Sequence, residues 1–193
     1  MHCRLFIAVA LFTSFAPFSL AADTPTRAYF GDTHLHTSFS PDAGMAGTTV
    51  GPNEAYQFVL GETVTSNTGQ QAKMAKPLDF VVIADHAENL GLADAIANAD
   101  PALLADPLGK QLYDLVKAGR GIDAFNLLVQ QMAKGAEAKI ENESMLKNAW
   151  LQTMVLADQY NSPGEFTAFI GYEWTSQPSG NNLHRVVVFR DDQ

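Results

Sequence analysis

The chain has 193 residues, of which 47% are hydrophobic, and its formal net charge is −9. That hydrophobic share is typical of a globular domain and excludes a largely disordered chain. The negative charge, with no basic run, disfavours nonspecific nucleic-acid binding, which needs a cationic surface. A small anionic substrate stays open, because bound divalent cations can reverse the local potential.

The first 21 residues have the pattern of a secretory signal peptide. Arg4 supplies the positive charge, residues 5–18 the apolar stretch, and Ser19-Leu20-Ala21 a small-x-small cleavage site. The alternative, a membrane anchor, needs a longer apolar run than this. We therefore expect export to the periplasm or the extracellular space, with no membrane span after cleavage. Cys3 precedes the apolar stretch, so the mature chain would have no cysteine.

Residues 22–193 are enough for one domain with its own core. Four segments are apolar enough to be buried strands of a parallel sheet, namely residues 28–34, 78–84, 166–172 and 184–189. Between the first two, residues 52–61 predict a short helix, because Pro52 suits a first turn and Gly61 an end. Together they form a β-α-β unit, with residues 62–76 as a polar connection.

A helical insertion is predicted over about residues 87–162. Asp100-Pro101 and Asp106-Pro107 are typical helix starts, and apolar residues recur at helical spacing within 108–116, 122–132 and 140–160. An insertion of this length could lie over the carboxyl ends of the strands as a lid, or it could simply cover the sheet. The last strand is followed almost at once by Gln193, so we expect the amino-terminal part of a longer protein.

Histidines and carboxylates gather at the predicted strand ends. His34 and His36 are two residues apart, so both can face one side of a strand, and His86 ends the next strand. Neutral imidazole is a good ligand for zinc, manganese or iron. A lone strand histidine is more often a hydrogen-bonded core residue, but the joint pattern favours metal. The expected ligands are His34, His36, Asp42, His86, Glu173 and His184.

Three further polar residues adjoin this predicted metal site. Asp32 and Asp85 are candidates to orient neighbouring ligands from outside the coordination shell. Arg185 could contact an anionic substrate such as a phosphate, although an ordinary ion pair is an equally good interpretation.

The motifs resemble the PHP superfamily, which is named for polymerase and histidinol phosphatase domains. The resemblance is carried by His34-Leu-His36-Thr37-x-x-Ser40-x-Asp42, Ala84-Asp85-His86, Gly171-Tyr-Glu173 and His184 before a strand. The runs Tyr29 to Ser38, Gly51 to Tyr56, Asp85 to Gly91 and Gly171 to Trp174 resemble a secreted branch, the domain-of-unknown-function 3604 family.

The resemblance implies an α/β fold, here part of a distorted (β/α)7 TIM-like barrel with a helical insertion, and a trinuclear metal site. It places His34, His36 and Glu173 on the first metal, Glu173 and His184 on the second, and Asp42 and His86 on the third. Asp42 stands where many members have histidine. The family pattern also needs a further histidine and a late Asp-x-His, and no histidine follows His184.

These observations predict an exported metal-dependent hydrolase with two or three divalent ions, most simply a phosphoesterase acting on a small anionic substrate. Two alternatives stay open, a hydrolase of a sulfate ester, amide or lactone, and a non-catalytic metal-binding module. For residues 22–193 alone we expect weak metal binding and little or no activity.

Overall fold

The computed structural model describes residues 26–134, 140, 143–176 and 182–190. The predicted signal peptide, residues 1–21, lies outside them. Helices and strands alternate along the chain, which confirms the mixed α/β class. Three parallel strands form the central sheet in the order β1 (Gly31–Leu35), β4 (Phe80–Ile83) and β5 (Thr167–Phe169). The described strands do not close into a barrel.

The predicted β-α-β unit is present. Helix α2 (Pro52–Val59) begins at Pro52 and ends just before Gly61, whose φ of 88° suits glycine. The connection after it contains a small hairpin of β2 (Val64–Thr65) and β3 (Gln71–Ala72). Sequence patterning did not predict this hairpin, because strands of two residues are too short to show an alternation.

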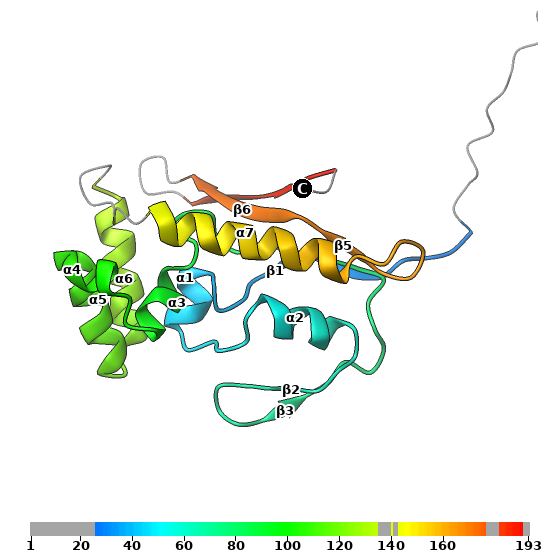
Figure 1. Cartoon of the computed structure of the whole chain (residues 1–193), viewed down its shortest axis with the longest axis horizontal. Coiled ribbons are helices and arrows are strands. Elements are labelled where there is room, and N and C mark those ends of the chain that lie inside the picture. The colour runs from blue at the N-terminus through cyan, green and yellow to red at the C-terminus, as the bar shows by residue number, and fades with distance from the viewer. Residues whose placement is uncertain (1–25, 135–139, 141–142, 177–181, 191–193) are drawn as a thin grey trace, which may run out of the picture.

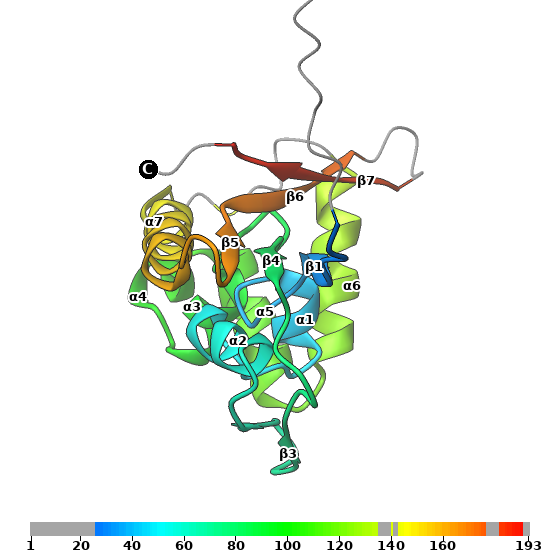
Figure 2. The same cartoon turned by 90° about the vertical axis from the view of Figure 1, so that its right-hand side faces the viewer.

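The third predicted strand, residues 166–172, is in fact two strands. β5 ends at Phe169, and β6 (Gly171–Ser176) begins a separate two-stranded sheet with β7 (Leu183–Val188) (Figure 2). A side chain at position 171 would overlap the Val82 side chain and the Val187 carbonyl oxygen. Gly171 therefore permits the close backbone approach at the point where the chain changes sheets.

The fourth strand does not belong to the parallel sheet. β7 runs antiparallel to β6, so the expectation of four parallel strands was wrong. The expectation that all four strands are buried was also wrong, since most of β1 and β7 is exposed. Only β4, which has a neighbour on each side, is largely buried.

The described residues of the insertion form five helices: α3 (Leu92–Ala97), α4 (Pro101–Ala105), α5 (Pro107–Lys117), α6 (Gly121–Met132) and α7 (Glu143–Tyr160). Asp100 and Asp106 cap α4 and α5, as the Asp-Pro pairs predicted, whereas α3 was not foreseen. Figure 1 shows α3 to α6 gathered at one end of the molecule, with α7 running from them along the strands.

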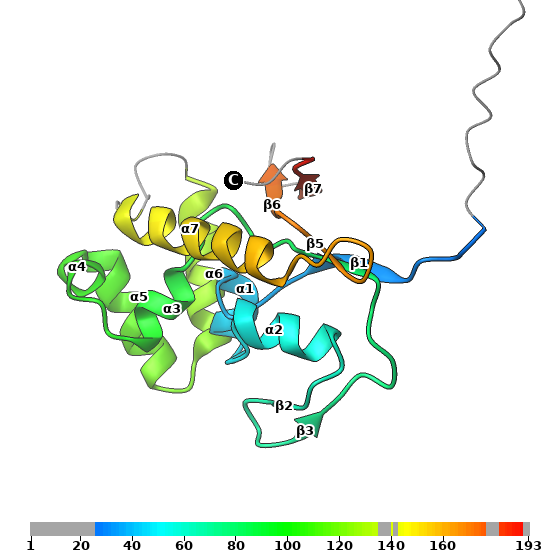
Figure 3. The same ribbon diagram turned by 45° about the vertical axis from the view of Figure 1, so that its right-hand side comes forward.

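Two hydrophobic clusters support this arrangement. One lies among α3 to α6 and includes Leu103, Leu112 and Leu128. The other lies between the central sheet and the pair α2 and α7 (Figure 3), where the rings of Tyr56 and Tyr160 stack with centroids 4.8 Å apart. The insertion thus does two things, because α7 covers the sheet and α3 to α6 build a second core. Among the described residues, no helix combines the length and apolarity needed to cross a bilayer.

Candidate metal centre

The carboxyl ends of β1 and β4 place three histidines together. The N–H of Ala84 donates to the carbonyl oxygen of Leu35 at 2.8 Å, which extends the pairing of the two strands beyond their ends. His36 directly follows Leu35, His86 lies two residues after Ala84, and His34 lies within β1. The expectation from parallel strands, that their final residues open at one edge, is confirmed for this pair.

Glu173 enters this edge from β6. Its N–H donates to the carbonyl oxygen of Asp85 at 3.0 Å, and its carbonyl oxygen accepts from the N–H of Ala87 at 2.8 Å. The residue is 1% exposed. These two backbone hydrogen bonds, to the residues before and after His86, fix the position of Glu173, the only carboxylate of β6.

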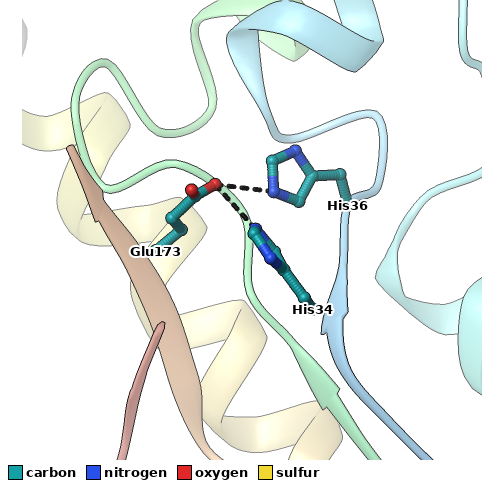
Figure 4. Close-up of side chains that lie close together, drawn as sticks. All are labelled: His34, His36 and Glu173. Atoms are coloured by element: carbon teal, nitrogen blue, oxygen red, sulfur yellow. Dashed lines mark ion pairs between the residues drawn. The ribbon is translucent and has the colours of Figure 1, made fainter. Parts of the chain in front are cut away.

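All four histidines of the described residues approach the Glu173 carboxylate. Oε2 lies 3.0 Å from Nε2 of His34 and 2.8 Å from Nε2 of His36 (Figure 4), and 3.3 Å from Nδ1 of His86. Oε1 lies 2.6 Å from Nδ1 of His184. One buried carboxylate is thus shared by imidazoles from β1, from the segments after β1 and β4, and from β7.

Two of these atoms lack a hydrogen bond. Nε2 of His36 and Oε2 of Glu173 are buried and only 2.8 Å apart, yet within the described part of the chain neither has a hydrogen-bond partner of suitable geometry. Leaving such atoms unsatisfied costs free energy, and native proteins rarely do so without a reason. A cation among them would satisfy both, since a carboxylate oxygen and an imidazole nitrogen are typical ligands of zinc and other transition metals. The residues therefore fit a metal ion.

Asp42 forms a second convergence with the same histidines. It lies in the first turn of α1 (Pro41–Met45), and its Oδ2 is 3.2 Å from Nδ1 of His36 and 3.5 Å from Nε2 of His86. The loop after β1 therefore brings Asp42 back to the sheet edge, as we expected of it. The helix itself was not predicted, because five residues are too few to show a periodicity.

The six expected ligands are all brought together, in three overlapping groups whose ligand atoms lie within 4.8 Å of one another. They are His34, His36 and Glu173; His36, Asp42 and His86; and His86, Glu173 and His184. His36, His86 and Glu173 each belong to two groups. Shared ligands of this kind suit a cluster of adjacent ions better than separate sites.

The electrostatics of the site follow from this crowding. Burial lowers the pKa of His36, but its hydrogen bond to Asp42 and the charges of Asp42, Glu173 and Asp85 outweigh burial and raise it above 6.5. Burial opposes ionisation of Asp42 and Glu173 too, yet the surrounding histidines hold the pKa of both carboxyls below the usual values. The two carboxylates are therefore charged at neutral pH, as metal ligands must be.

Asp85 and Asp32 act on the backbone beside the histidines. The buried Asp85 carboxylate accepts hydrogen bonds from the N–H and the hydroxyl of Thr37, the latter at 2.7 Å. Asp32 accepts from the N–H of His34 at 2.8 Å. We predicted that these two residues orient ligands, and the structure places them on main chain next to a ligand, with no hydrogen bond to an imidazole ring among the described contacts.

Arg185 lies away from the cluster. Its guanidinium carbon is 5.3 Å from the centroid of the Trp174 ring, the partner of Arg185 in the register of β6 and β7. Successive residues of a strand alternate sides, so His184 faces the cluster and Arg185 faces the other way. The structure thus offers a cation–π contact where we considered a substrate contact.

Several polar residues at the site were missed by sequence reasoning. The Thr175 hydroxyl lies 2.9 Å from Nδ1 of His86 and 3.2 Å from Nδ1 of His184, and the Thr175 N–H donates to the Glu88 carboxylate at 3.2 Å. The buried Ser40 hydroxyl contacts His36, Asp42 and the N–H of His86. Thr175 could have been found, because it lies two residues after Glu173 on the same strand face.

Comparison with known protein families identifies the family of the chain. The family model described as "Protein of unknown function (DUF3604)" matches residues 23–193, which agrees with the resemblance seen in the motifs. No curated protein and no solved structure matches the chain.

Proposed function

The chain belongs to the DUF3604 family, and we propose that it carries the metal-binding part of an exported, PHP-like, metal-dependent hydrolase that acts on a phosphoester. The observation that carries the proposal is the convergence of four histidines on Glu173. Nε2 of His36 and Oε2 of Glu173, which lie 2.8 Å apart, are both buried and have no hydrogen bond among the described residues. The order of the motifs along the chain supports the PHP assignment, and the predicted signal peptide supports export.

Each ion would draw its ligands from one of the three groups. His34, His36 and Glu173 would bind the first ion. Glu173 would also bind a second ion together with His184, and Asp42 and His86 would bind a third. When bound, divalent zinc, manganese or iron supplies Lewis acidity, which lowers the pKa of water to near neutrality and neutralises phosphate oxygens. No side chain at the site then needs to act as a covalent nucleophile.

The rest of the site holds these ligands in place. Thr175 and Ser40 place hydroxyl groups beside the imidazole nitrogens of His86, His184 and His36, which restricts ring orientation. Asp85 fixes the loop after His36 through Thr37. A small anionic substrate fits this arrangement, since cations held here would offset the negative charge of the chain.

The test is metal analysis and turnover of the full-length protein with manganese, zinc or iron and a generic aryl phosphate. We expect the double variant His34→Ala/His36→Ala to lose bound metal and turnover, and Thr33→Ala, on the same strand, to keep both. Unchanged metal content in the double variant would contradict the assignment of His34 and His36 as metal ligands. Turnover of a sulfate ester or lactone in place of the phosphate would show that the enzyme cleaves a different bond at the same metal site. Tight metal binding without turnover on any ester would identify a non-catalytic module.

A further inference from the structure

A small cavity of about 200 Å³ adjoins the candidate metal centre. On one side it is lined by His86, Glu88, Thr175 and His184, and on the other by residues of α6. Two of its lining histidines are candidate metal ligands, so anything in the cavity lies next to the bond that the site would cleave.

The two walls differ in chemistry. The α6 wall presents four apolar residues, Phe125, Leu128, Val129 and Met132, and one polar residue, Asn126. Of the described residues that line the cavity, none is a lysine or arginine, and Glu88 adds a negative charge. An anionic group is therefore disfavoured inside the cavity, whereas a neutral apolar group can bury surface against α6.

The apolar wall is held in place at both ends of α6. At its start, a side chain at Gly121 would overlap the carbonyl oxygen of Met45, so α6 packs directly on α1, the helix that carries Asp42. At its end, the Asn89 side-chain amide donates to the sulfur of Met132 at 3.5 Å, which links α6 to the segment after His86. Both contacts join α6 to the segments that carry ligands, so the cavity is preformed.

Resting on the proposed function, we infer that this cavity is a specificity subsite for a neutral, apolar, ring-sized group of the substrate, joined to the anionic group that the metals hold. The size supports a single ring, because a water molecule occupies about 30 Å³ in the liquid and drug-sized ligands need pockets of roughly 300–1,000 Å³. A nucleoside or a peptide would exceed it.

Two non-hydrolysable probes, phenylphosphonate and methylphosphonate, test the subsite by calorimetric titration of the manganese-loaded full-length protein. They carry the same charged group and differ in the ring. We expect phenylphosphonate to bind at least about tenfold more tightly, since burial of a ring's apolar surface is worth that much even after losses. Equal affinities would overturn the subsite and leave the proposed function intact. Failure of both probes to bind the metal-loaded protein would overturn the proposed phosphoesterase function and the subsite with it.

Variants of Val129 test whether the preference for phenylphosphonate arises in this cavity. Val129→Ile and Val129→Phe reduce the cavity in two steps, so the preference for phenylphosphonate should fall in the same order, and methylphosphonate affinity and metal content should stay unchanged. The matched control is Gln130→Phe, which adds the same ring at the neighbouring exposed position. Methylphosphonate binding reports whether each variant is folded, and Val129→Ile keeps the test usable if Val129→Phe is not. A preference that survives both Val129 variants, or that falls equally in Gln130→Phe, would overturn the assignment.

Discussion

The two edges of the central sheet are both hollow, but they differ in how their polar atoms are satisfied. The amino-terminal edge has the larger hollow, about 510 Å³, lined by Arg27, Asp79, Glu165 and several aromatic residues. There the charged groups have partners: Arg27 pairs with Asp79 at 2.6 Å, and Ser162 donates to Glu165 at 3.2 Å. The carboxyl edge has less space beside it, yet two of its buried polar atoms have no hydrogen bond to any residue that the structure describes.

The difference shows that unsatisfied ligand atoms locate the site better than volume does. The hydroxyl oxygen of Tyr56 is a third buried polar atom without a partner, but it lies in the hydrophobic cluster between the sheet and α2 and α7. What distinguishes His36 and Glu173 is that their unsatisfied atoms face each other and are surrounded by other ligand-type groups. A satisfied surface hollow has no such need for a bound ion.

The largest contrast between the two edges should come from paired carboxylate variants. Glu173→Gln removes the charge that four histidines share, and we expect metal affinity to fall about a hundredfold or more, since loss of an outer partner alone costs roughly 10- to 100-fold. Glu165→Gln is the same change at the amino edge and should leave affinity unaltered. Metal titration by calorimetry measures both, and similar affinities for the two variants would remove the distinction between the edges.

Acidification should weaken metal binding at the carboxyl edge. The pKa of His36 is raised above 6.5 by Asp42, Glu173 and Asp85 against the effect of burial, and a protonated imidazole cannot bind metal. As pH falls below this pKa, affinity should drop by about tenfold per pH unit from His36 alone. Asp42 and Glu173 have lowered pKa values and stay charged over this range. A metal affinity that is constant between pH 8 and pH 5.5 would contradict this account.

A stability change of intermediate size is expected from Thr37→Val. The variant removes the hydroxyl that donates to buried Asp85, which should lower the free energy of unfolding of the metal-free protein by about 1–3 kcal/mol. Burial raises the pKa of Asp85 to about 6, although the hydrogen bonds from Thr37 oppose the rise.

The sign of the pH dependence follows from that raised value. The stabilising contribution of Asp85 is complete below its ordinary pKa of 3.8 and is lost as pH rises through about 6. The hydroxyl of Thr37 matters most to the ionised carboxylate, so the variant should be more destabilised at pH 8 than at pH 5. Urea unfolding at both pH values measures this, with exposed Thr65→Val as the control. An equal loss at the two pH values would show that Asp85 is not the affected group.

The smallest effect is expected at the amino edge, from Arg27→Ala. The ion pair with Asp79 is solvent-exposed on the arginine side, where 64% of the side chain is accessible. Exposed pairs contribute about 0–1 kcal/mol, so thermal unfolding should shift only slightly and metal affinity not at all. A large loss of metal binding in Arg27→Ala would mean that the two edges are coupled.

The convergence of the candidate ligands could be predicted in large part because it follows from local rules. His34 and His36 lie two residues apart in an extended segment, and the Asp85-His86 pair comes directly after a continuous apolar run, so both strand ends could be recognised in the sequence. Glu173 and His184 were expected in the cluster for a partly wrong reason. They reach the cluster through an antiparallel pair, in which Thr175 lies opposite His184, and not through two further parallel strands.

The remaining features depend on contacts between distant segments. Gly171 signalled a close approach, but nothing in the local pattern showed that the chain would leave one sheet for another at that position. β1 is exposed because it is an outer strand of a three-stranded sheet, and the order of strands in a sheet cannot be read from hydrophobicity. The contact of α6 with α1 depends on Gly121 meeting the Met45 backbone, far away in sequence, so the cavity beside the cluster could not be foreseen.

Glu173 is reached by His34 from one end of the described chain and by His184 from the other. A shared ion cluster would therefore act as a cross-link that closes most of the chain into a loop, and loop closure restricts an unfolded ensemble more as the loop lengthens. The sequence has a single cysteine, so no disulfide within the chain can do this. Because ions that bind only the folded state stabilise it by mass action, resistance to unfolding in this protein should depend on the free concentration of metal around it.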